Sequence, residues 1–304
     1  MLNYLLSKLG QSFSNKESLN KINQIYDNLE HTYADTEDPW GLNLIKSKMA
    51  MSFAYPIYHN YFKTRVIGKE KVNDRPYMFV ANHSGQIPID GMLITCAFLL
   101  DVWPPRILRT MIERFVTSLP FFSNFVNENG AVLGDRSNCY HLLRRGESIL
   151  VFPEGVRGIS KNTKDYYKVQ NFTRGFFRLA LKANIDILPI SVVGAEEFFP
   201  YVYHFKDIAK NLKLPTLPVT PFMPFLGPVA ALPLPSPVDI IIGEPYSIPN
   251  NLSPDAPDHK IDLHVKNIEN TIRRLTHEGL SNRRAFWGTK LLSQDQLLKN
   301  ALKT

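Results

Sequence analysis

Short apolar runs separated by helical patterns are the feature that most limits the fold of this sequence. From Tyr77 onward the runs are "YMFVAN", "RILRTMI", "GAVLG", "ESILVFPEG", "IDILPISVVG" and "VDIIIGEP". Helical patterns lie between most of them, for example "GMLITCAFLL", "RSNCYHLLRRG" and "NFTRGFFRLALKA". Such alternation favours a mixed, largely parallel sheet with helices on both faces. The sequence therefore predicts an α/β fold.

The chain has 304 residues, which is long enough for one large core with appended helices. We expect an N-terminal helical segment over residues 1–72, an α/β domain over 73–250 and a C-terminal helical tail over 251–304. Within the first segment, helical patterns are interrupted at Pro56, so two helices are expected there.

Charge and cysteine content limit the classes of partner only loosely. A net charge of +7 fits nucleic acid, an anionic membrane surface or an acidic substrate equally well. The two cysteines, Cys96 and Cys139, provide neither a disulfide framework nor a metal-ligand spacing. The first residues lack the features of a signal peptide. A reducing compartment is therefore expected.

A histidine follows the first predicted strand of the α/β segment. At a strand end, the neutral imidazole of His83 could take a proton from a substrate hydroxyl if a carboxylate held its other nitrogen. Asp90 could be that carboxylate, but it is also a good cap for the helix expected at 91–100. The two residues alone leave both interpretations open.

Polar loops follow other predicted strands as well. The stretch "LVFPEGVRG" places Glu154, Gly155 and Arg157 in one turn, where glycine permits close backbone approach and arginine suits phosphate or carboxylate. Arg136 stands at a helix start after another short strand. An exposed turn and a solvated arginine are the alternatives. Because strand ends share one edge of such a sheet, these loops could converge.

A serine hydrolase is a rival interpretation, since Ser84 is adjacent to His83. Adjacent side chains at a strand end point apart, however, and the chain contains no G-x-S-x-G motif. The sequence therefore favours a site built on His83 without a serine nucleophile.

Four blocks in fixed order carry a resemblance to a known family. They are "NHSGQIPID", "GAVLGDR", "VFPEGVRG" and "ILPISVVG", and with them residues 77–246 resemble the glycerolipid acyltransferases of the lysophospholipid acyltransferase superfamily. The resemblance implies a glycerol-3-phosphate acyltransferase-like fold with N-terminal helices. It also implies transfer of an acyl group from a CoA or carrier-protein thioester to a lipid hydroxyl, with no metal or other cofactor.

The resemblance also implies roles for individual residues. His83 would be the catalytic base and Asp90 would orient it, while Pro189 in the fourth block would lie near the acyl donor. The implied acceptor-binding residues are Gly130, Arg136, Phe152, Pro153, Glu154, Gly155 and Arg157.

This chain departs from the family pattern between His83 and Asp90. The family leaves four residues between the two, whereas six intervene here. A seven-residue offset spans about 10 Å in a helix, so a direct contact demands a loop. Gly85 and Pro88 suit such a loop. Similar lengthened versions belong to branches that esterify acylglycerols.

Two lipid classes are candidate acceptors, and we expect the phosphorylated class, with the neutral class as the alternative. Arg136 and Arg157 favour a phosphorylated acceptor such as lysophosphatidate or a lysophospholipid. The lengthened loop and the proline-rich stretch 214–238 favour a neutral monoacylglycerol or diacylglycerol. A non-catalytic lipid-binding membrane protein of the same fold is a further alternative. Nucleic acid is not an expected partner, because no recognition motif is present.

Two segments bear on membrane contact. Residues 45–71 hold six Lys/Arg and one Glu among apolar and aromatic residues, which fits either a helix in the headgroup layer or one packed on the sheet. The stretch 214–238 contains eight prolines and cannot be an ordinary membrane-spanning helix. With a lipid substrate, we expect a peripheral or monotopic protein at the cytoplasmic face of a membrane.

Overall fold

The computed structural model describes residues 8, 10, 14–33, 38–84, 89–117, 122–199, 203–204, 218–219, 225, 227, 232–284 and 294–303. The strands are β1 (Arg65–Ile67), β2 (Met78–Ala81), β3 (Arg109–Ile112), β4 (Val132–Leu133), β5 (Ile149–Val151), β6 (Ile187–Val193), β7 (Tyr203–His204), β8 (Pro218–Val219) and β9 (Asp239–Ile242). The α-helices are α2 (Lys16–Tyr33), α3 (Leu44–Pro56), α4 (Ile89–Leu100), α5 (Arg114–Thr117), α6 (Phe122–Glu128), α7 (Arg136–Arg144), α8 (Val156–Ile159), α9 (Gly175–Ala183), α12 (Asp258–Ser281) and α13 (Gln294–Leu302). Short helices of other types are η1 (Ile57–Tyr61), η2 (Lys69–Lys71), η3 (Thr163–Asp165) and η4 (Ala195–Phe198).

Seven strands form the main sheet, in the order β1-β9-β6-β2-β5-β3-β4. All neighbouring pairs are parallel except β6 and β9. At the centre, Val80 of β2 pairs with Val151 of β5 on one side and with Pro189 of β6 on the other. The expected mixed, largely parallel sheet is therefore confirmed.

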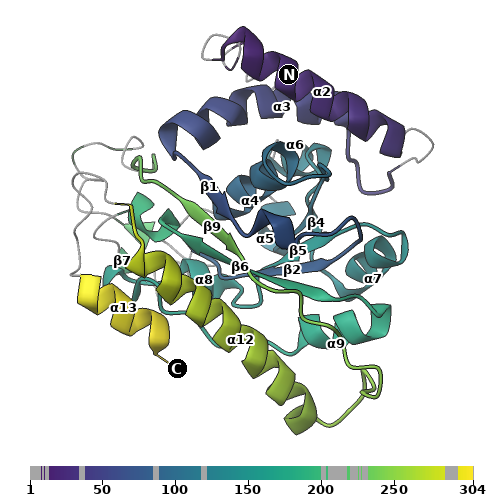
Figure 1. The fold of residues 1–304 in the computed structure, drawn as a ribbon, viewed down its shortest axis with the longest axis vertical. Coiled ribbons are helices and arrows are strands. Elements are labelled where there is room, and N and C mark those ends of the chain that lie inside the picture. The colour runs from purple at the N-terminus through teal and green to yellow at the C-terminus, as the bar shows by residue number, and fades with distance from the viewer. Residues whose placement is uncertain are drawn as a thin grey trace.

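Helices cover both faces of this sheet (Figure 1). Alternate residues of β2 point to opposite faces, so Phe79 packs with residues of α2, α3 and α4, whereas Val80 packs with residues of α7, α9 and α12. Every residue of β2 and β6 is buried, which explains why their sequences are continuous apolar runs.

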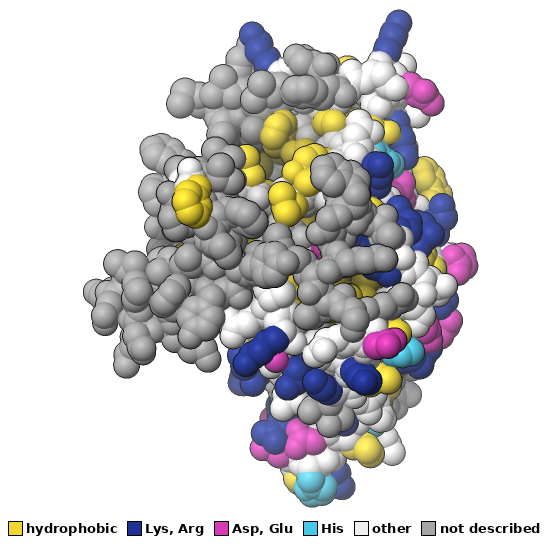
Figure 2. Space-filling model, turned by 90° about the vertical axis from the view of Figure 1, so that its left-hand side faces the viewer, with side chains coloured by type: hydrophobic (Ala, Val, Ile, Leu, Met, Phe, Trp, Pro, Cys, Tyr) yellow, Lys and Arg dark blue, Asp and Glu magenta, His cyan; other side chains and the backbone are white. Residues whose placement is uncertain are grey.

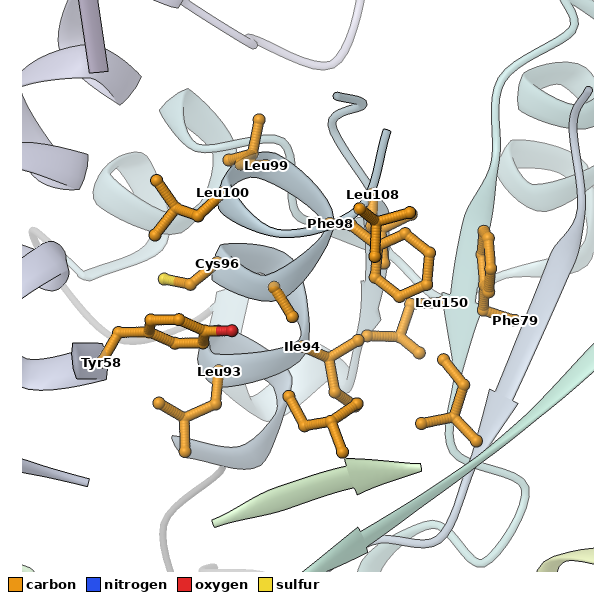
Figure 3. Packing of buried hydrophobic residues seen from close by; sticks show 14 of the residues in the cluster. Tyr58, Phe79, Leu93, Ile94, Cys96, Phe98, Leu99, Leu100, Leu108 and Leu150 are labelled. Atoms are coloured by element: carbon orange, nitrogen blue, oxygen red, sulfur yellow. The ribbon is translucent and has the colours of Figure 1, made fainter. Parts of the chain in front are cut away.

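Helix α4 lies between the sheet and the N-terminal helices. It is apolar almost all round, and Figure 3 shows Phe98 near Phe79 of β2 and Leu93 near Tyr58 of η1. A helix buried on several sides needs this composition, because only a narrow stripe at Ile89, Met92 and Thr95 is partly exposed. Its N-terminal end is thereby fixed relative to the end of β2.

The N-terminal segment packs on this core. Pro56 ends α3, and the backbone continues as the π-helix η1, where the Phe62 amide donates to the Ile57 carbonyl at 2.9 Å. Tyr58 and Phe62 are fully buried, whereas Ile45 and Tyr61 are exposed. Much of the apolar surface of residues 45–71 therefore faces the protein core. The membrane-associating role of the N-terminal segment and the two boundaries between the three segments stay predictions.

The sequence did not indicate β1, which is only three residues long and half-exposed. It joins the sheet through β9, and Arg65 forms a bidentate ion pair with the buried Asp239 at 3.0 and 3.1 Å. Most of the proline-rich stretch 214–238 lies outside the described residues.

One face of the molecule carries grouped hydrophobic side chains and, below them in the view, lysine and arginine side chains (Figure 2). Tyr61, Leu232 and Leu234 are exposed, and the Tyr61 hydroxyl donates to the Pro233 carbonyl at 2.6 Å, which brings these segments together. Within the described ranges, we find no helix with the length and apolar character needed to cross a bilayer.

Candidate active site

The candidate site forms where β2 and β5 end. These strands are parallel neighbours, so the segments that follow them leave the sheet at the same edge. His83 comes two residues after β2, and Glu154 comes three residues after β5. The Glu154 carboxylate accepts the His83 amide at 2.8 Å. The structure therefore brings the first and third sequence blocks into direct contact.

His83 and Asp90 form a hydrogen-bonded pair, with 2.7 Å between His83 Nδ1 and Asp90 Oδ2. Asp90 is completely buried in the first turn of α4, and it also accepts the amides of Ser84 and Gly91, each at 2.8 Å. The proposed loop residues Gly85 and Pro88 lie outside the described residues. When Nδ1 donates to Asp90, the other ring nitrogen, Nε2, is left as a proton acceptor.

Phe152 supports the imidazole from one side. Its ring stacks on the His83 ring with 4.2 Å between centroids and 22° between planes. The His83 side chain retains 12% exposure, so the ring is supported but not sealed from ligands. The role of Phe152 in binding the acceptor stays a prediction.

Gly158 of α8 lies directly against His83. A Cβ at this position would meet His83 Cβ at 2.5 Å and the His83 carbonyl oxygen at 3.1 Å. Contacts that close do not occur between real atoms, so only glycine fits there without displacement. The sequence signal for this contact is the final glycine of "PEGVRG".

Glu154 is almost fully buried, and both its carboxylate oxygens are occupied. Oε1 accepts the His83 amide at 2.8 Å, and Oε2 accepts the Gln170 amide at 2.7 Å. In this structure, the carboxylate braces two loops. Direct contact between Glu154 and an acceptor stays a prediction.

Arg157 is exposed and also braces a loop. Its Nη2 donates to the Asn171 carbonyl at 2.9 Å, and its Nε lies 3.4 Å from the Glu154 carbonyl. Gly155 adopts a positive φ of 57° before α8, and Pro153 is buried. The turn predicted at this motif is present, and its backbone needs the glycine.

The second block lies farther from His83 in the sheet, whereas the fourth block is β6, a direct neighbour of β2. Arg136 begins α7 after β4, and two strands, β5 and β3, separate β4 from β2. Gly130 precedes β4 with a φ of 94°. Pro189 is buried inside β6 and pairs with Val80. The acceptor and donor roles given to these residues stay predictions.

The Ser84 hydroxyl is buried and has no hydrogen-bond partner within the described part of the chain. Its amide donates to Asp90 Oδ2, so its main chain contributes to holding the carboxylate. This arrangement gives no support to a serine nucleophile activated by His83, which would require a hydrogen bond between the two side chains.

Sequence reasoning missed Lys161 and Glu196. Lys161 is buried beside the pair, with Nζ 3.2 Å from the His83 carbonyl oxygen and 2.7 Å from Glu196 Oε1. Burial raises the pKa of Glu196 to about 7, while the ammonium of Lys161 acts in the opposite direction. Neither residue stands at a sequence spacing from His83 or Asp90 that would indicate a place in this site.

Comparison with known proteins places this site within a described domain. Residues 63–193 match the family model described as "Acyltransferase". Uncharacterised proteins of Mycobacterium bovis and Mycobacterium leprae are each 33% identical over 76% of this chain and over 66% and 64% of their own lengths. A human protein described as "DGAT1/2-independent enzyme synthesizing storage lipids" is 30% identical over 47% of this chain and 43% of its own length.

The chain thus spans slightly less than two thirds of the mycobacterial relatives and less than half of the human one. A crystal structure of the 1-acyl-sn-glycerophosphate acyltransferase PlsC from Thermotoga maritima matches 91% of this chain and 96% of that one, with 18% identity and a TM-score of 0.49. The family match includes His83, Asp90, Glu154 and Arg157. The segment that holds the candidate site, residues 63–193, is thus similar to the acyltransferase family.

Proposed function

We propose that this chain transfers a fatty acyl group from an acyl thioester, carried by CoA or a carrier protein, to a hydroxyl of a glycerolipid. The observation that carries the proposal is the 2.7 Å hydrogen bond between His83 and the buried Asp90, inside the region that matches the acyltransferase model. A histidine oriented by a buried carboxylate suits removal of a proton from a hydroxyl.

The reaction needs no covalent enzyme intermediate, because the thioester is already activated. His83 Nε2 takes the proton of the acceptor hydroxyl, and the oxygen attacks the thioester carbonyl carbon. Asp90 stabilises the imidazolium that forms. The tetrahedral intermediate then collapses, the C–S bond breaks, and the leaving thiolate takes the proton from His83. The products are an ester and a free thiol.

Release of free thiol is the direct test. Purified protein is mixed with an acyl-CoA, or an acylated carrier protein, and lipid acceptors in vesicles. We expect acceptor-dependent thiol release from the wild type and none above background from His83→Ala. An acceptor-independent signal would indicate thioester hydrolysis. Absence of release from folded wild type with every acceptor would favour the non-catalytic lipid-binding alternative.

The identity of the acceptor is a finer part of the proposal, and we favour a neutral monoacylglycerol or diacylglycerol. The Arg157 guanidinium donates to the Asn171 carbonyl, so one of its nitrogens already holds the loop that contains Asn171. The name of the human relative, which refers to storage lipids, points in the same direction.

Lysophosphatidate or a lysophospholipid is the second candidate. Arg136 and Arg157 are both exposed in loops that follow strands β4 and β5, and guanidinium groups suit a phosphate. Arg157→Ala separates the two candidates. A phosphorylated acceptor predicts a rise of about tenfold or more in its KM, as expected for a lost charged hydrogen bond, with little change for neutral acceptors. Equal losses of activity with phosphorylated and neutral acceptors would instead support a role of Arg157 in holding the loop.

These acceptors reside in membranes, so we also propose that the protein meets lipid at the cytoplasmic face of a membrane. The exposed side chains of Tyr61, Leu232 and Leu234 support this contact. Sedimentation with anionic vesicles should carry the protein into the pellet, and high salt should release it at least partly. A protein that stays in the supernatant would contradict the contact.

A further inference from the structure

A lysine is buried beside the candidate base. Lys161 follows α8 and is only 5% exposed. Its Nζ lies 2.7 Å from Glu196 Oε1 and 3.8 Å from Glu154 Oε2. Burial works to lower the pKa of Lys161, but Glu154 and Glu196 outweigh it and raise the pKa, so the ammonium stays charged. A buried charge is retained only when such partners stabilise it.

Lys161 and Glu154 together hold the main chain of His83. Glu154 accepts the His83 N–H at 2.8 Å, and Lys161 donates to the His83 carbonyl at 3.2 Å. The ring itself is held by Asp90 and by stacking on Phe152. The backbone contacts and the ring contacts together fix the direction in which Nε2 points.

Glu196 anchors this lysine to another part of the sheet. Glu196 lies in η4, just after β6, and its Oε2 accepts the Tyr167 amide at 2.8 Å. Tyr167 has a φ of 62°, which is unfavourable for a non-glycine residue and needs support from its surroundings. The ion pair therefore links the end of β6 to the end of β2.

The adjacent Glu197 offers an internal comparison. It is similarly buried, and its carboxylate accepts Arg283 Nε at 2.8 Å and the Tyr167 hydroxyl at 2.5 Å. Glu196 contacts the lysine that holds His83, whereas Glu197 contacts an arginine after α12. Two neighbouring buried ion pairs thus differ in whether they reach His83.

We propose that Lys161 and Glu196 form a positioning pair that holds His83 for proton transfer. The inference rests on the proposed acyl transfer. The charged groups around His83 are Asp90 from α4, Glu154 after β5, Lys161 after α8 and Glu196 of η4. Lys161 holds the His83 carbonyl and Glu196 holds Lys161, so loss of either side chain should let the main chain of His83 and its imidazole shift.

The NMR signals of the His83 imidazole test the positioning without substrate. The wild type is compared with Lys161→Met, and the signals are assigned by their loss in His83→Gln. Loss of the Lys161 contact to the His83 carbonyl should shift or broaden these signals, because the residue is no longer held in one orientation. Glu196→Gln should also change them, because it weakens the anchor of Lys161. Lys161→Arg keeps a charged donor and should leave the signals near their wild-type positions.

Steady-state kinetics test the positioning part. Lys161→Met should lower kcat for thiol release by about tenfold to a hundredfold, with KM for the thioester changed less than about threefold, because misplacement of a base affects the chemical step. Glu197→Gln is the matched control. It removes a similarly buried charge and should lower Tm, but it should leave kcat and the NMR signals of His83 unchanged.

The outcomes separate the positioning pair from the proposed function. Unchanged His83 signals in Lys161→Met, or equal kcat losses in Lys161→Met and Glu197→Gln, would overturn the positioning pair. If Lys161→Met does not fold, the change expected in the His83 signals of Glu196→Gln decides in its place. If the wild type releases no thiol with any acceptor, the proposed function fails, while the NMR signals still decide whether the pair acts on His83.

Discussion

Two clusters of charged side chains in this protein differ in burial. The His83 cluster comprises His83, Asp90, Glu154, Lys161 and Glu196. The surface cluster joins α9 to α12 through Arg174, Arg178, Asp258 and Asp262. Ion-pair distances are similar, at 2.7 Å for Lys161–Glu196 and 2.7 Å for Arg178–Asp258. The side chains of Lys161 and Glu196 are at most 4% exposed, whereas that of Asp258 is 61% exposed.

The difference indicates which charges have a fixed geometry. Water can replace the partners of an exposed ion pair, so its contribution is small and its loss is tolerated. A buried carboxylate has no such replacement, and each of its oxygens needs a protein donor. Asp90 and Glu154 meet this requirement with main-chain N–H groups at 2.7 to 2.8 Å. Burial thus holds the orientation of His83.

The largest effect is expected inside the His83 cluster, from Asp90→Asn. The side-chain amide that replaces the carboxylate can still accept the Ser84 N–H. It carries no charge, however, and so cannot stabilise an imidazolium. We expect at least about a hundredfold loss in kcat, the lower end of general-base assistance. Thiol-release kinetics measure it. A variant with normal kcat and only a reduced Tm would indicate that Asp90 stabilises the first turn of α4 and has no part in catalysis.

A smaller but still clear effect is expected from Gly158→Ala, which adds one methyl group against His83. The 2.5 Å approach to His83 Cβ forces the imidazole or α8 to shift, and a displaced base should lower kcat about tenfold or more. Gly175→Ala in α9 is the matched control, because a Cβ there meets nothing within 4 Å. Equal activities in the two variants would contradict the close packing of α8 on His83.

The smallest effect is expected in the surface cluster, from Arg174→Ala. This side chain forms ion pairs with Asp258 and Asp262, both of which are exposed. Because water can solvate all three groups, kcat should stay at the wild-type value and Tm should change little. A large loss of activity would remove the distinction between the two regions.

Much of the fold could be predicted from the sequence. The buried strands β2, β5, β6 and β9 have continuous apolar sequences, and α4, α7 and α9 fall within the helical patterns between them. The short edge strand β1 has no such signal, because only one of its residues is even partly buried. The antiparallel pairing of β9 with β6 has no signal in the sequence of either strand, because both read as continuous apolar runs.

The candidate site was predictable only where a motif marked it. His83 and Asp90 follow a strand in a recognisable block, although their roles remain predictions. Lys161 and Glu196 meet across 35 positions, and Lys161 meets His83 across 78. Such contacts arise from the order of strands in the sheet and leave no local spacing. Arg157 is the opposite case, a residue that a motif marks but whose contact the motif does not predict. The same motif would fit an arginine that binds a ligand and the observed arginine, which donates to the Asn171 carbonyl.

The central claim is that His83, oriented by Asp90, removes the proton from the acceptor hydroxyl. The most direct measurement follows thiol release and ester formation together in one sample, with an acyl-CoA and an acylglycerol in vesicles, for the wild type and for His83→Ala. The account predicts equal amounts of thiol and ester from the wild type and neither from the variant, with both proteins equally folded by circular dichroism. Ester formation by His83→Ala at the wild-type rate would contradict it.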